Sequence, residues 1–543
     1  MASGRPAPSA RPKHPHRSFS LGERAAGLLV HVTSLPGPHG NGDIGPEARR
    51  FIDFLAAAGQ RWWQMLPVNP VGEGNSPYSG VSAFAGNPLL ISLHDLASDG
   101  LLEPSDLAFR LEPGRADYAN AFRERTRALR KAFDAYRRSP AHHHRAFERF
   151  RAEASFWLFD YALYMALRTA LNGKPWPEWP AGIARRRKAD VQRTARELAG
   201  EIAYFEFEQF VFRRQWDRLR SHARERGVGL IGDAPIFIAQ ESAEVWSSSR
   251  FFTLDSGGHP TFVAGVPPDY FSKTGQRWGN PLYRWQAHAR TRYRWWVERF
   301  RTLLSHFDVV RLDHFIGFSR YWEVRAEEKT AEHGNWRAGP GQRLFDAVRE
   351  ELGDTPFIAE DLGEVTPEVR RLRDAMGLPG MRVFQFAFGS DQQANDFLPH
   401  RYVRHAVAYT GTHDNDTFAG WFTDPGGKAR PRSAAQAAKE RRAALEYLCG
   451  PRARESVRDV HWAAIRALYA SVADTAIIPM QDVLGLDNRA RMNLPGRANG
   501  NWEWRFTSRD ATPRLAARLR ALAGVYERLP RAGPAGQSRN PAR

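Results

Sequence analysis

The sequence is almost free of cysteine. Cys449 is the single cysteine among 543 residues, so no disulfide can form within the chain and a cysteine-based metal site is disfavoured. This usage is typical of a reducing compartment, and we expect a cytoplasmic protein. A lone cysteine without a reactive motif most often packs as a small hydrophobe, so we predict that Cys449 is buried.

Long apolar runs are also missing. No uninterrupted stretch approaches the roughly 20 residues that a membrane helix needs, and the first residues lack the apolar core of a secretory signal. Hydrophobic residues make up 42% of the chain and charged residues 25%, which is the composition of a globular protein. We therefore expect no membrane association.

Acidic residues are too few to balance the basic ones, and the formal net charge is +18. Such an excess invites a nucleic-acid interpretation. Much of it, however, lies in two terminal segments, 1–24 and 531–543, which are rich in Pro and Arg and poor in acids. We expect both to be disordered tails. The charge then favours weak contacts with polyanions, and we expect no specific nucleic-acid partner.

Short apolar runs alternate with helical-length amphipathic segments through the rest of the chain, which is the pattern of β/α units. Eight of these runs are bounded by Gly, Pro or polar turns, and they predict a (β/α)8 TIM barrel. The eight predicted strands lie within residues 27–32, 62–68, 228–237, 308–315, 356–361, 381–388, 406–414 and 475–482.

Two connections are too long for simple crossovers. We expect a catalytic barrel over residues 25–530 that is interrupted by a mainly helical subdomain at 93–226, between the second and third strands. A second interruption at 239–283 includes "FVAGVPPDYFSKTGQRWGNPLY". Because that stretch is rich in Gly, Pro and aromatic residues, we expect an irregular lid loop between the third and fourth strands.

Four acids occupy the ends of predicted strands. Asp233, Asp313, Glu360 and Asp414 each close an apolar run, at the end where barrel enzymes carry their catalytic side chains. One such acid is commonly a helix cap or an ion-pair partner. Four acids on one face would repel one another without a task or a counter-charge, and Arg311 is placed to supply one. The pattern therefore favours a catalytic centre.

Two carboxylates that flank one bond, one ionised and one protonated, are the equipment of glycoside cleavage. A third acid can bind neighbouring sugar hydroxyls and raise the pKa of the proton donor. Metal binding is the competing use of such acids. The chain shows no alternating Asp/Asn calcium loop, so we expect neither a metal nor a cofactor.

The motifs carry a family resemblance. The segments "TSLPGPHGNGDIG", "SPYSGVSAFAGNPLLI", "GDAPIF", "GVPPDYFSKTGQRWGNPLY", "RLDHF", "AEDLGEVTPEV", "LPGMRVFQFAFG", "YTGTHDNDT" and "ARMNLPG" occur in this order between about Gly27 and Arg505. The chain resembles the amylomaltases, which are 4-α-glucanotransferases of glycoside hydrolase family 77 and are related to the α-amylase clan.

The resemblance implies roles for individual residues. Asp313 resembles the family's nucleophile, Glu360 its acid/base and Asp414 its transition-state stabiliser. Substrate-binding positions are matched by Tyr78, Asp233, Tyr270, Trp278, Arg311, His314 and His413. Three positions depart from the family pattern, because Ile316 and Asn335 stand where Arg is expected and Arg325 stands where Pro is usual.

The expected reaction is retaining transfer of an α-1,4-glucan segment through a glycosyl-Asp313 intermediate. The donor is a maltooligosaccharide and the acceptor is the 4-hydroxyl of another glucan or of glucose. Retention predicts carboxyl groups of Asp313 and Glu360 roughly 5–5.5 Å apart. Aromatic residues near the lid, including Trp246, Phe271 and Trp278, are expected to exclude water.

Hydrolysis of α-1,4-glucans is the alternative, since the same acids permit it. A non-catalytic glycan-binding barrel would require the loss of a catalytic acid, and none is lost. The sequence does not determine the oligomeric state or the preferred glucan lengths.

Overall fold

The computed structural model describes residues 19–268, 272–390, 393–427, 432–451, 459–497 and 499–530. Within these ranges no helix combines the length and the apolar composition needed to cross a lipid bilayer. The acids of interest all fall inside the described ranges, whereas Tyr270 and Phe271 lie outside them.

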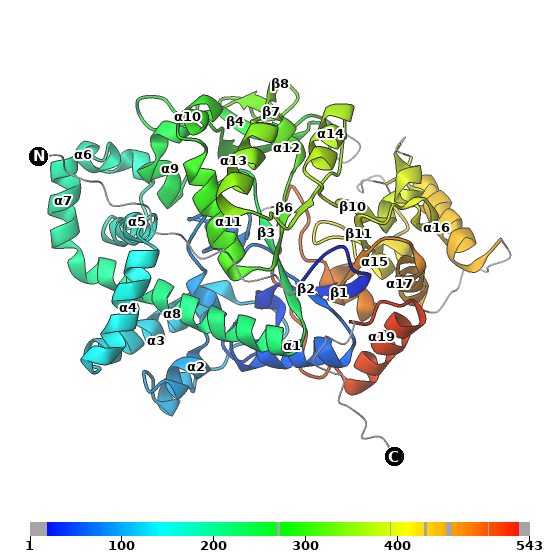
Figure 1. Ribbon diagram of the computed structural model, residues 1–543, viewed down its shortest axis with the longest axis horizontal. Helices are drawn as coiled ribbons and strands as arrows, with labels where there is room; N and C mark the ends of the chain where they lie inside the picture. Colours follow the sequence, from blue (N-terminus) through cyan, green and yellow to red (C-terminus); the bar gives the residue numbers. More distant parts are fainter. Residues whose placement is uncertain are drawn as a thin grey trace, which may run out of the picture.

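Eight parallel strands close into a barrel at the centre of the molecule (Figure 1), and the predicted (β/α)8 architecture is confirmed. Each strand falls within or next to one of the predicted apolar runs. In their order around the barrel, the strands are β1 (Ala25–Leu29), β12 (Thr475–Pro479), β11 (Ala406–Tyr409), β10 (Gly380–Val383), β9 (Phe357–Ala359), β6 (Val309–Leu312), β3 (Gly229–Ala234) and β2 (Trp62–Gln64).

One large side chain at the edge of the barrel interior explains two of the strand glycines. Trp62 is fully buried on β2 between Gly27 of β1 and Gly229 of β3. A Cβ atom at Gly27 or at Gly229 would come within 2.5 Å of Trp62, which is closer than atoms pack. Gly229 therefore makes room for the indole ring, and Gly27 makes room for the Cβ and backbone carbonyl of Trp62. Side chains of the described strands fill the barrel and leave no pore.

Helices surround the barrel (Figure 1). Their apolar faces repeat at helical spacing and pack inward; for example, Phe51, Ile52 and Leu55 of α1 are buried. The helices that follow barrel strands are α1 (Pro46–Ala57), α11 (Arg294–His306), α13 (Gln342–Leu352), α14 (Pro367–Ala375), α15 (Phe418–Thr423), α16 (Ala434–Cys449), α17 (Val460–Ala470), α18 (Met480–Val483) and α19 (Pro513–Val525).

The chain between β2 and β3 is mainly helical, as predicted. Its helices gather around the long α8 at the left of Figure 1, where aromatic residues such as Phe207 and Phe210 are buried against α3 and α4. The elements are α2 (Leu93–Ser98), α3 (Tyr118–Arg137), α4 (Ala141–Glu153), α5 (Leu158–Ala170), α6 (Ala181–Ala184), α7 (Lys188–Glu197) and α8 (Ala199–Glu225).

The prediction that residues 262–283 form an irregular loop is wrong. This stretch contains β4 (Phe262–Val266) and β5 (Gln276–Pro281), which pair as an antiparallel hairpin. The hairpin belongs to a second sheet of order β5-β4-β7-β8, with β7 (Arg320–Arg325) and β8 (Gly334–Ala338) contributed by the chain after β6. The strands are not evident from local composition, because the second partner of β4, strand β7, lies about 60 residues further along the chain. Three short helices lie in the same part of the chain, α9 (Ala243–Ser247), α10 (Trp285–Arg290) and α12 (Ile316–Ser319), of which α12 packs on β7.

Cys449 is exposed at the end of α16, so the prediction of burial is wrong. It is the last helical residue before Gly450, and its neighbour Leu448 takes the inward position instead.

Candidate active site

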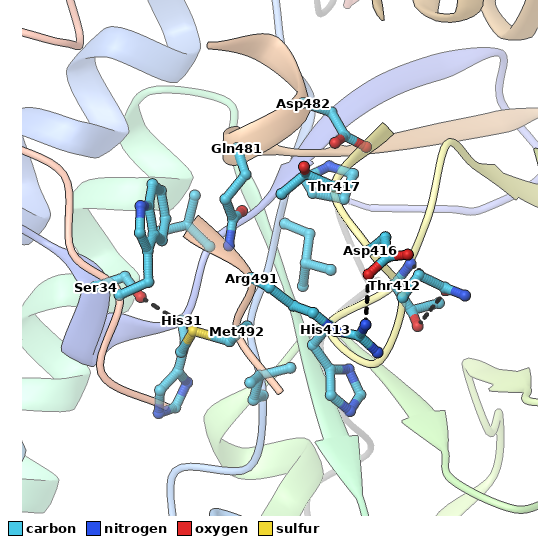
Figure 2. A pocket seen from close by; sticks show the side chains of 16 residues that line it. His31, Ser34, Thr412, His413, Asp416, Thr417, Gln481, Asp482, Arg491 and Met492 are labelled. Atoms are coloured by element: carbon cyan, nitrogen blue, oxygen red, sulfur yellow. Dashed lines mark hydrogen bonds and ion pairs between the residues drawn. The ribbon is translucent and has the colours of Figure 1, made fainter. Parts of the chain in front are cut away.

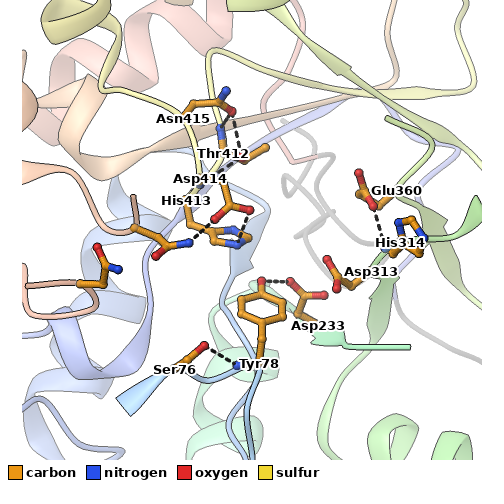
Figure 3. A network of polar contacts seen from close by, with 12 residues as sticks. Ser76, Tyr78, Asp233, Asp313, His314, Glu360, Thr412, His413, Asp414 and Asn415 are labelled. Carbon is orange, nitrogen blue, oxygen red and sulfur yellow. Dashed lines mark hydrogen bonds and ion pairs between the residues drawn. The ribbon is translucent and has the colours of Figure 1, made fainter. Parts of the chain in front are cut away.

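The four predicted acids lie at the carboxyl ends of barrel strands. Asp233 is the second-last residue of β3, Asp313 directly follows β6, and Glu360 directly follows β9. Asp414 lies in the loop after β11. Figure 3 shows the side chains of Asp313, Glu360 and Asp414 projecting toward one common space, with Tyr78 and Asp233 beside it. Residues separated by up to 336 positions in the chain are thus brought into one site.

A buried guanidinium joins two of these acids. One nitrogen of Arg311, Nη1, donates to both carboxylate oxygens of Asp233 at 2.9 and 2.7 Å and to Oδ1 of Asp313 at 2.9 Å. The hydroxyl of Tyr78 donates to Asp233 Oδ2 at 2.7 Å. Arg311 and Asp233 are almost fully buried, whereas 26% of the Asp313 side chain is exposed. Of the two acids bound to Arg311, Asp313 is therefore the one that faces the open space.

Glu360 is held by a backbone donor. The N–H of His314 donates to Glu360 Oε2 at 2.6 Å, and His314 has a left-handed backbone with φ of 49°. That conformation is costly for a residue with a side chain and is found where the surrounding structure imposes it. The turn after β6 therefore directs the Asp313 carboxylate into the site and its next amide toward Glu360.

Burial separates the ionisation of the two acids. Burial raises the pKa of Asp313 to about 6, against the opposing charge of Arg311. Burial raises the pKa of Glu360 well above its usual range; Arg311 opposes this rise, and the negative charge of Asp313 adds to it. Near neutral pH the site thus holds an ionised Asp313 beside a protonated Glu360.

Asp414 has a different environment. Burial acts to raise its pKa, but the charge of His413 and hydrogen bonds from His413 and Asn493 outweigh that effect and lower the pKa to about 2. His413 Nε2 lies 3.1 Å from Asp414 Oδ2, and the amide of Asn493 donates to Oδ1 at 2.6 Å. The His413 ring also stacks on Tyr78, with 5.0 Å between ring centroids. Asp414 therefore stays ionised at neutral pH.

Arg491 organises the loop that carries Asp414, and sequence reasoning did not single it out. Its guanidinium binds the carboxylate of Asp416 and the backbone carbonyl of Asp414, as Figure 2 shows for Asp416. Its Nε donates to the carbonyl of Asn493 at 2.6 Å. Arg491 and Asn493 both belong to "ARMNLPG", a motif noticed in the sequence without a role for any of its residues.

Beneath this loop, Figure 2 shows a small pocket bordered by His31, His413 and Arg491. Burial lowers the pKa of His31 to about 3, so this imidazole is neutral. The pocket measures about 30 Å³, which is enough for little more than a water molecule. The space belongs to the support of the site and does not accommodate a sugar.

The hairpin β4–β5 reaches the site through Trp278. This side chain is 38% exposed on β5, and its ring meets the His314 ring edge to face, with centroids 4.9 Å apart. Burial lowers the pKa of His314 to about 4, so the ring that Trp278 contacts is neutral. Tyr270, the other predicted residue of this segment, lies outside the described residues.

Trp246 does not lie at the site, contrary to expectation. It is buried in α9, packs on Trp179 with ring centroids 5.5 Å apart, and donates its indole N–H to the carbonyl of Ile183 at 3.1 Å. It therefore joins the helical insertion to the chain after β3, which is a structural role.

The three departures from the family pattern lie away from the carboxylates of Asp313, Glu360 and Asp414. Ile316 is buried at the start of α12. Arg325 pairs with Glu327 at the end of β7, and Asn335 lies opposite Glu323 in the β7–β8 pair. Two of the three positions thus lie in the second sheet.

No cluster of three or more His, Cys, Asp or Glu side chains suited to hold a metal ion occurs in the described part of the chain. The acids are instead held by Arg311, by backbone and side-chain amides and by His413. The barrel and its cluster of carboxylates define the class of (β/α)8 barrel proteins with a candidate site at the carboxyl ends of the strands, where barrel enzymes have their active sites.

Comparison with known proteins identifies the family. A family model described as 4-alpha-glucanotransferase matches residues 30–511. A 4-alpha-glucanotransferase of Thermus thermophilus is 48% identical over 93% of this chain and 99% of its own. The structure of an amylomaltase from Streptococcus agalactiae in complex with acarbose aligns with a TM-score of 0.87 and 36% identity, covering 94% of this chain and all of the other. The chain therefore belongs to the 4-α-glucanotransferases of glycoside hydrolase family 77.

Proposed function

We propose that the chain transfers segments of α-1,4-glucans from a donor maltooligosaccharide to the 4-hydroxyl of an acceptor glucan or glucose. The proposal rests on family membership and on one observation in the site. Asp313 is bound to Arg311, whereas the carboxyl of Glu360 accepts only a backbone N–H among the described hydrogen bonds. This arrangement favours an anion at Asp313 and an acid at Glu360.

The first half of the reaction uses both acids. The carboxylate of Asp313 attacks the anomeric carbon, the glycosidic C–O bond breaks, and the proton of Glu360 passes to the leaving oxygen. Because Glu360 Oε2 already accepts the N–H of His314, Oε1 is the oxygen that carries the proton. A covalent glycosyl-Asp313 ester and an ionised Glu360 result.

The second half reverses these roles. Glu360 takes the proton from the 4-hydroxyl of the acceptor, and that oxygen displaces Asp313 from the anomeric carbon. Asp414 remains ionised and accepts hydrogen bonds from the sugar hydroxyls, while His413 and Asn493 hold it in place. We assign four further residues to the sugar at the cleavage point. Tyr78, Asp233 and His314 lie around the same space in Figure 3, and Arg311 binds Asp233.

Transfer instead of hydrolysis requires that water be kept from the ester. The hairpin β4–β5 supports this, because Trp278 brings an indole against His314 at the carboxyl end of β6. Pairing of β4 with β7 anchors the hairpin to the segment that follows Asp313. We propose that the hairpin covers the bound glucan and excludes water from the cleavage point.

Incubation with pure maltotriose separates transfer from hydrolysis. Transfer yields glucose together with maltopentaose and longer oligomers, because the maltosyl unit is passed to a second maltotriose. Hydrolysis yields glucose and maltose with nothing longer. Chromatography of the early products decides between the two, and a ladder without longer oligomers would favour the hydrolase alternative.

A further inference from the structure

A second cavity lies away from the carboxylates, between the helical insertion and the chain after β3. It measures about 490 Å³ and is bordered by α5, α9 and the start of α11. This volume falls within the roughly 300–1,000 Å³ of small-molecule sites. The described residues that line it include none of the acids or substrate-binding residues of the first site. We propose that this cavity is a second binding site for a neutral α-1,4-glucan segment, an inference that rests on the proposed function.

Aromatic rings form the walls of the cavity. Phe84 is buried and packs on Phe156, Trp157 and Trp295, with centroid separations of 5.7, 6.3 and 5.7 Å. Phe156 is nevertheless 38% exposed, so part of its ring is presented to solvent. Sugar rings carry an apolar C–H face that packs well on such surfaces.

Planar polar groups surround these rings. The Arg294 guanidinium lies over the Phe156 ring at 5.8 Å, and the Arg250 guanidinium lies over Phe251 at 4.8 Å. Both side chains line the cavity, and neither pairs with a carboxylate among the described residues. Their N–H groups are therefore free to donate to the vicinal hydroxyls of a sugar ring.

The charges around the cavity favour a neutral ligand over an anion. Asp160 also lines it and retains one carboxylate oxygen beyond the one that accepts from Arg186 at 2.6 Å. Both oxygens of Glu244, in contrast, are engaged by the Ser82 hydroxyl at 2.6 Å and the Ala83 N–H at 3.0 Å. Two acids and two arginines line the cavity, so its formal charge is balanced, and it offers both donors and an acceptor to sugar hydroxyls.

Two segments that build the cavity lie close in the chain to residues of the first site. Phe84 comes six residues after Tyr78, and α9 begins nine residues after β3, which carries Asp233. Glu244 ties these two segments together through Ser82 and Ala83. On this proposal, a glucan held in the cavity stays with the protein while another glucan segment reacts at the first site. Such retention raises the effective concentration of chains at the first site.

Matched variants test the proposal. Phe156→Ala combined with Arg294→Ala removes one wall and one donor of the cavity. The control combines Phe159→Ala with Arg292→Ala. Phe159 is 42% exposed in α5, three residues after Phe156, and Arg292 precedes Arg294 by two residues, but neither lines the cavity. Kinetics on amylose and on maltotriose are measured for both pairs and for the unaltered enzyme.

We expect the cavity pair to raise the KM for amylose about five-fold, equivalent to about 1 kcal/mol of lost binding, with kcat and the KM for maltotriose unchanged. The control pair retains the KM of the unaltered enzyme for both substrates. An equal KM for amylose in the two pairs would overturn the proposal.

Calorimetric titration with maltopentaose, on the Glu360→Gln background to prevent cleavage, gives a second reading. Two binding events per chain are expected, of which the cavity pair removes one. A single event in the Glu360→Gln protein would contradict the second site. If two events occur but the unaltered enzyme forms no transfer products from any glucan, the proposed function fails while the cavity remains a sugar site.

Discussion

At the scale of single residues, the decisive feature is the different environment of three carboxylates. Asp313 faces Arg311, Glu360 faces a backbone amide, and Asp414 is held by His413 and Asn493. The pKa of Asp313 rises to about 6 and that of Glu360 rises well beyond its usual range, whereas that of Asp414 falls to about 2. Environments that separate the pKa values of neighbouring acids assign the acid and the base of a reaction.

Replacement of Glu360 by Gln preserves the shape of the side chain and removes its proton. We expect kcat to fall by about 10²–10⁴-fold, the usual contribution of a general acid, with the far-ultraviolet circular dichroism unchanged. Glu364→Gln serves as the control, because Glu364 is exposed and lies four residues further along the same loop. Retained activity in the Glu360 variant would reject its role.

The pH dependence of kcat/KM reports the same groups. Asp313 must be ionised, so activity falls as the pH drops through about 6, and it falls again at high pH as Glu360 loses its proton. The negative charge of Asp233 contributes to the raised pKa of Asp313. Asp233→Asn removes that charge, and we expect the acidic limb to move to lower pH.

The control for this shift is Asp374→Asn, because Asp374 is an exposed acid of α14, and its acidic limb should coincide with that of the unaltered enzyme. An acidic limb that stayed in place, or moved to higher pH, in the Asp233 variant would contradict the assignment of this limb to Asp313.

At the scale of secondary-structure elements, a loop and a hairpin outside the barrel contribute two residues of the candidate site, Asp414 and Trp278. The barrel strands place Asp233, Asp313 and Glu360 at one end, but Asp414 sits in a loop that Arg491 holds from the chain after β12. Trp278 comes from a hairpin whose ladder partner β7 follows β6. The candidate site is therefore completed by elements whose positions depend on long-range pairing.

Trp278 provides a test at this scale. Trp278→Ala removes the ring that lies against His314, and we expect water to reach the glycosyl ester more easily, so that the ratio of hydrolysis to transfer rises several-fold. Reducing-end assays combined with product chromatography measure this ratio. Arg277→Ala is the control, since neighbouring residues of a strand point to opposite faces, and an equal ratio in both variants would argue against a covering role for Trp278.

At the scale of the whole molecule, the barrel closes where the first and last strands pair. Strand β1 pairs with β12 along its whole length. The fully buried Arg528 donates to the carbonyl of Ala25, the first residue of β1, at 2.9 Å and to that of Asp474, just before β12, at 3.1 Å. It also binds the carbonyls of Leu468, Tyr469, Ser471 and Ala473. One side chain near the end of the described chain thus holds the closure together.

Arg528→Met removes one donor from each of these buried carbonyls. Those of Leu468, Tyr469, Ser471 and Asp474 keep a second donor from Ser471, Arg24 or the Ala25 N–H, whereas those of Ala25 and Ala473 lose the donor that Arg528 supplies. Because each unsatisfied buried group costs about 1–3 kcal/mol, we expect the free energy of unfolding to fall by about 3 kcal/mol or more. A urea titration measures the change, and Arg514→Met, at an exposed position of α19, is expected to leave the midpoint in place. A similar midpoint for both variants would show that Arg528 does not stabilise the closure.

The sequence by itself determined the barrel and the acids at its mouth. Each buried strand is a short apolar run, and an acid at its end is visible because buried carboxylates are rare and costly. The same local view failed for residues 262–283 and for Trp246, since neither a ladder partner nor a packing neighbour can be read from adjacent residues. Only the tertiary structure decided that Arg491 and Asn493 support Asp414 and that Trp278 meets His314. Those contacts join segments far apart in the chain, and their geometry depends on how the whole barrel closes.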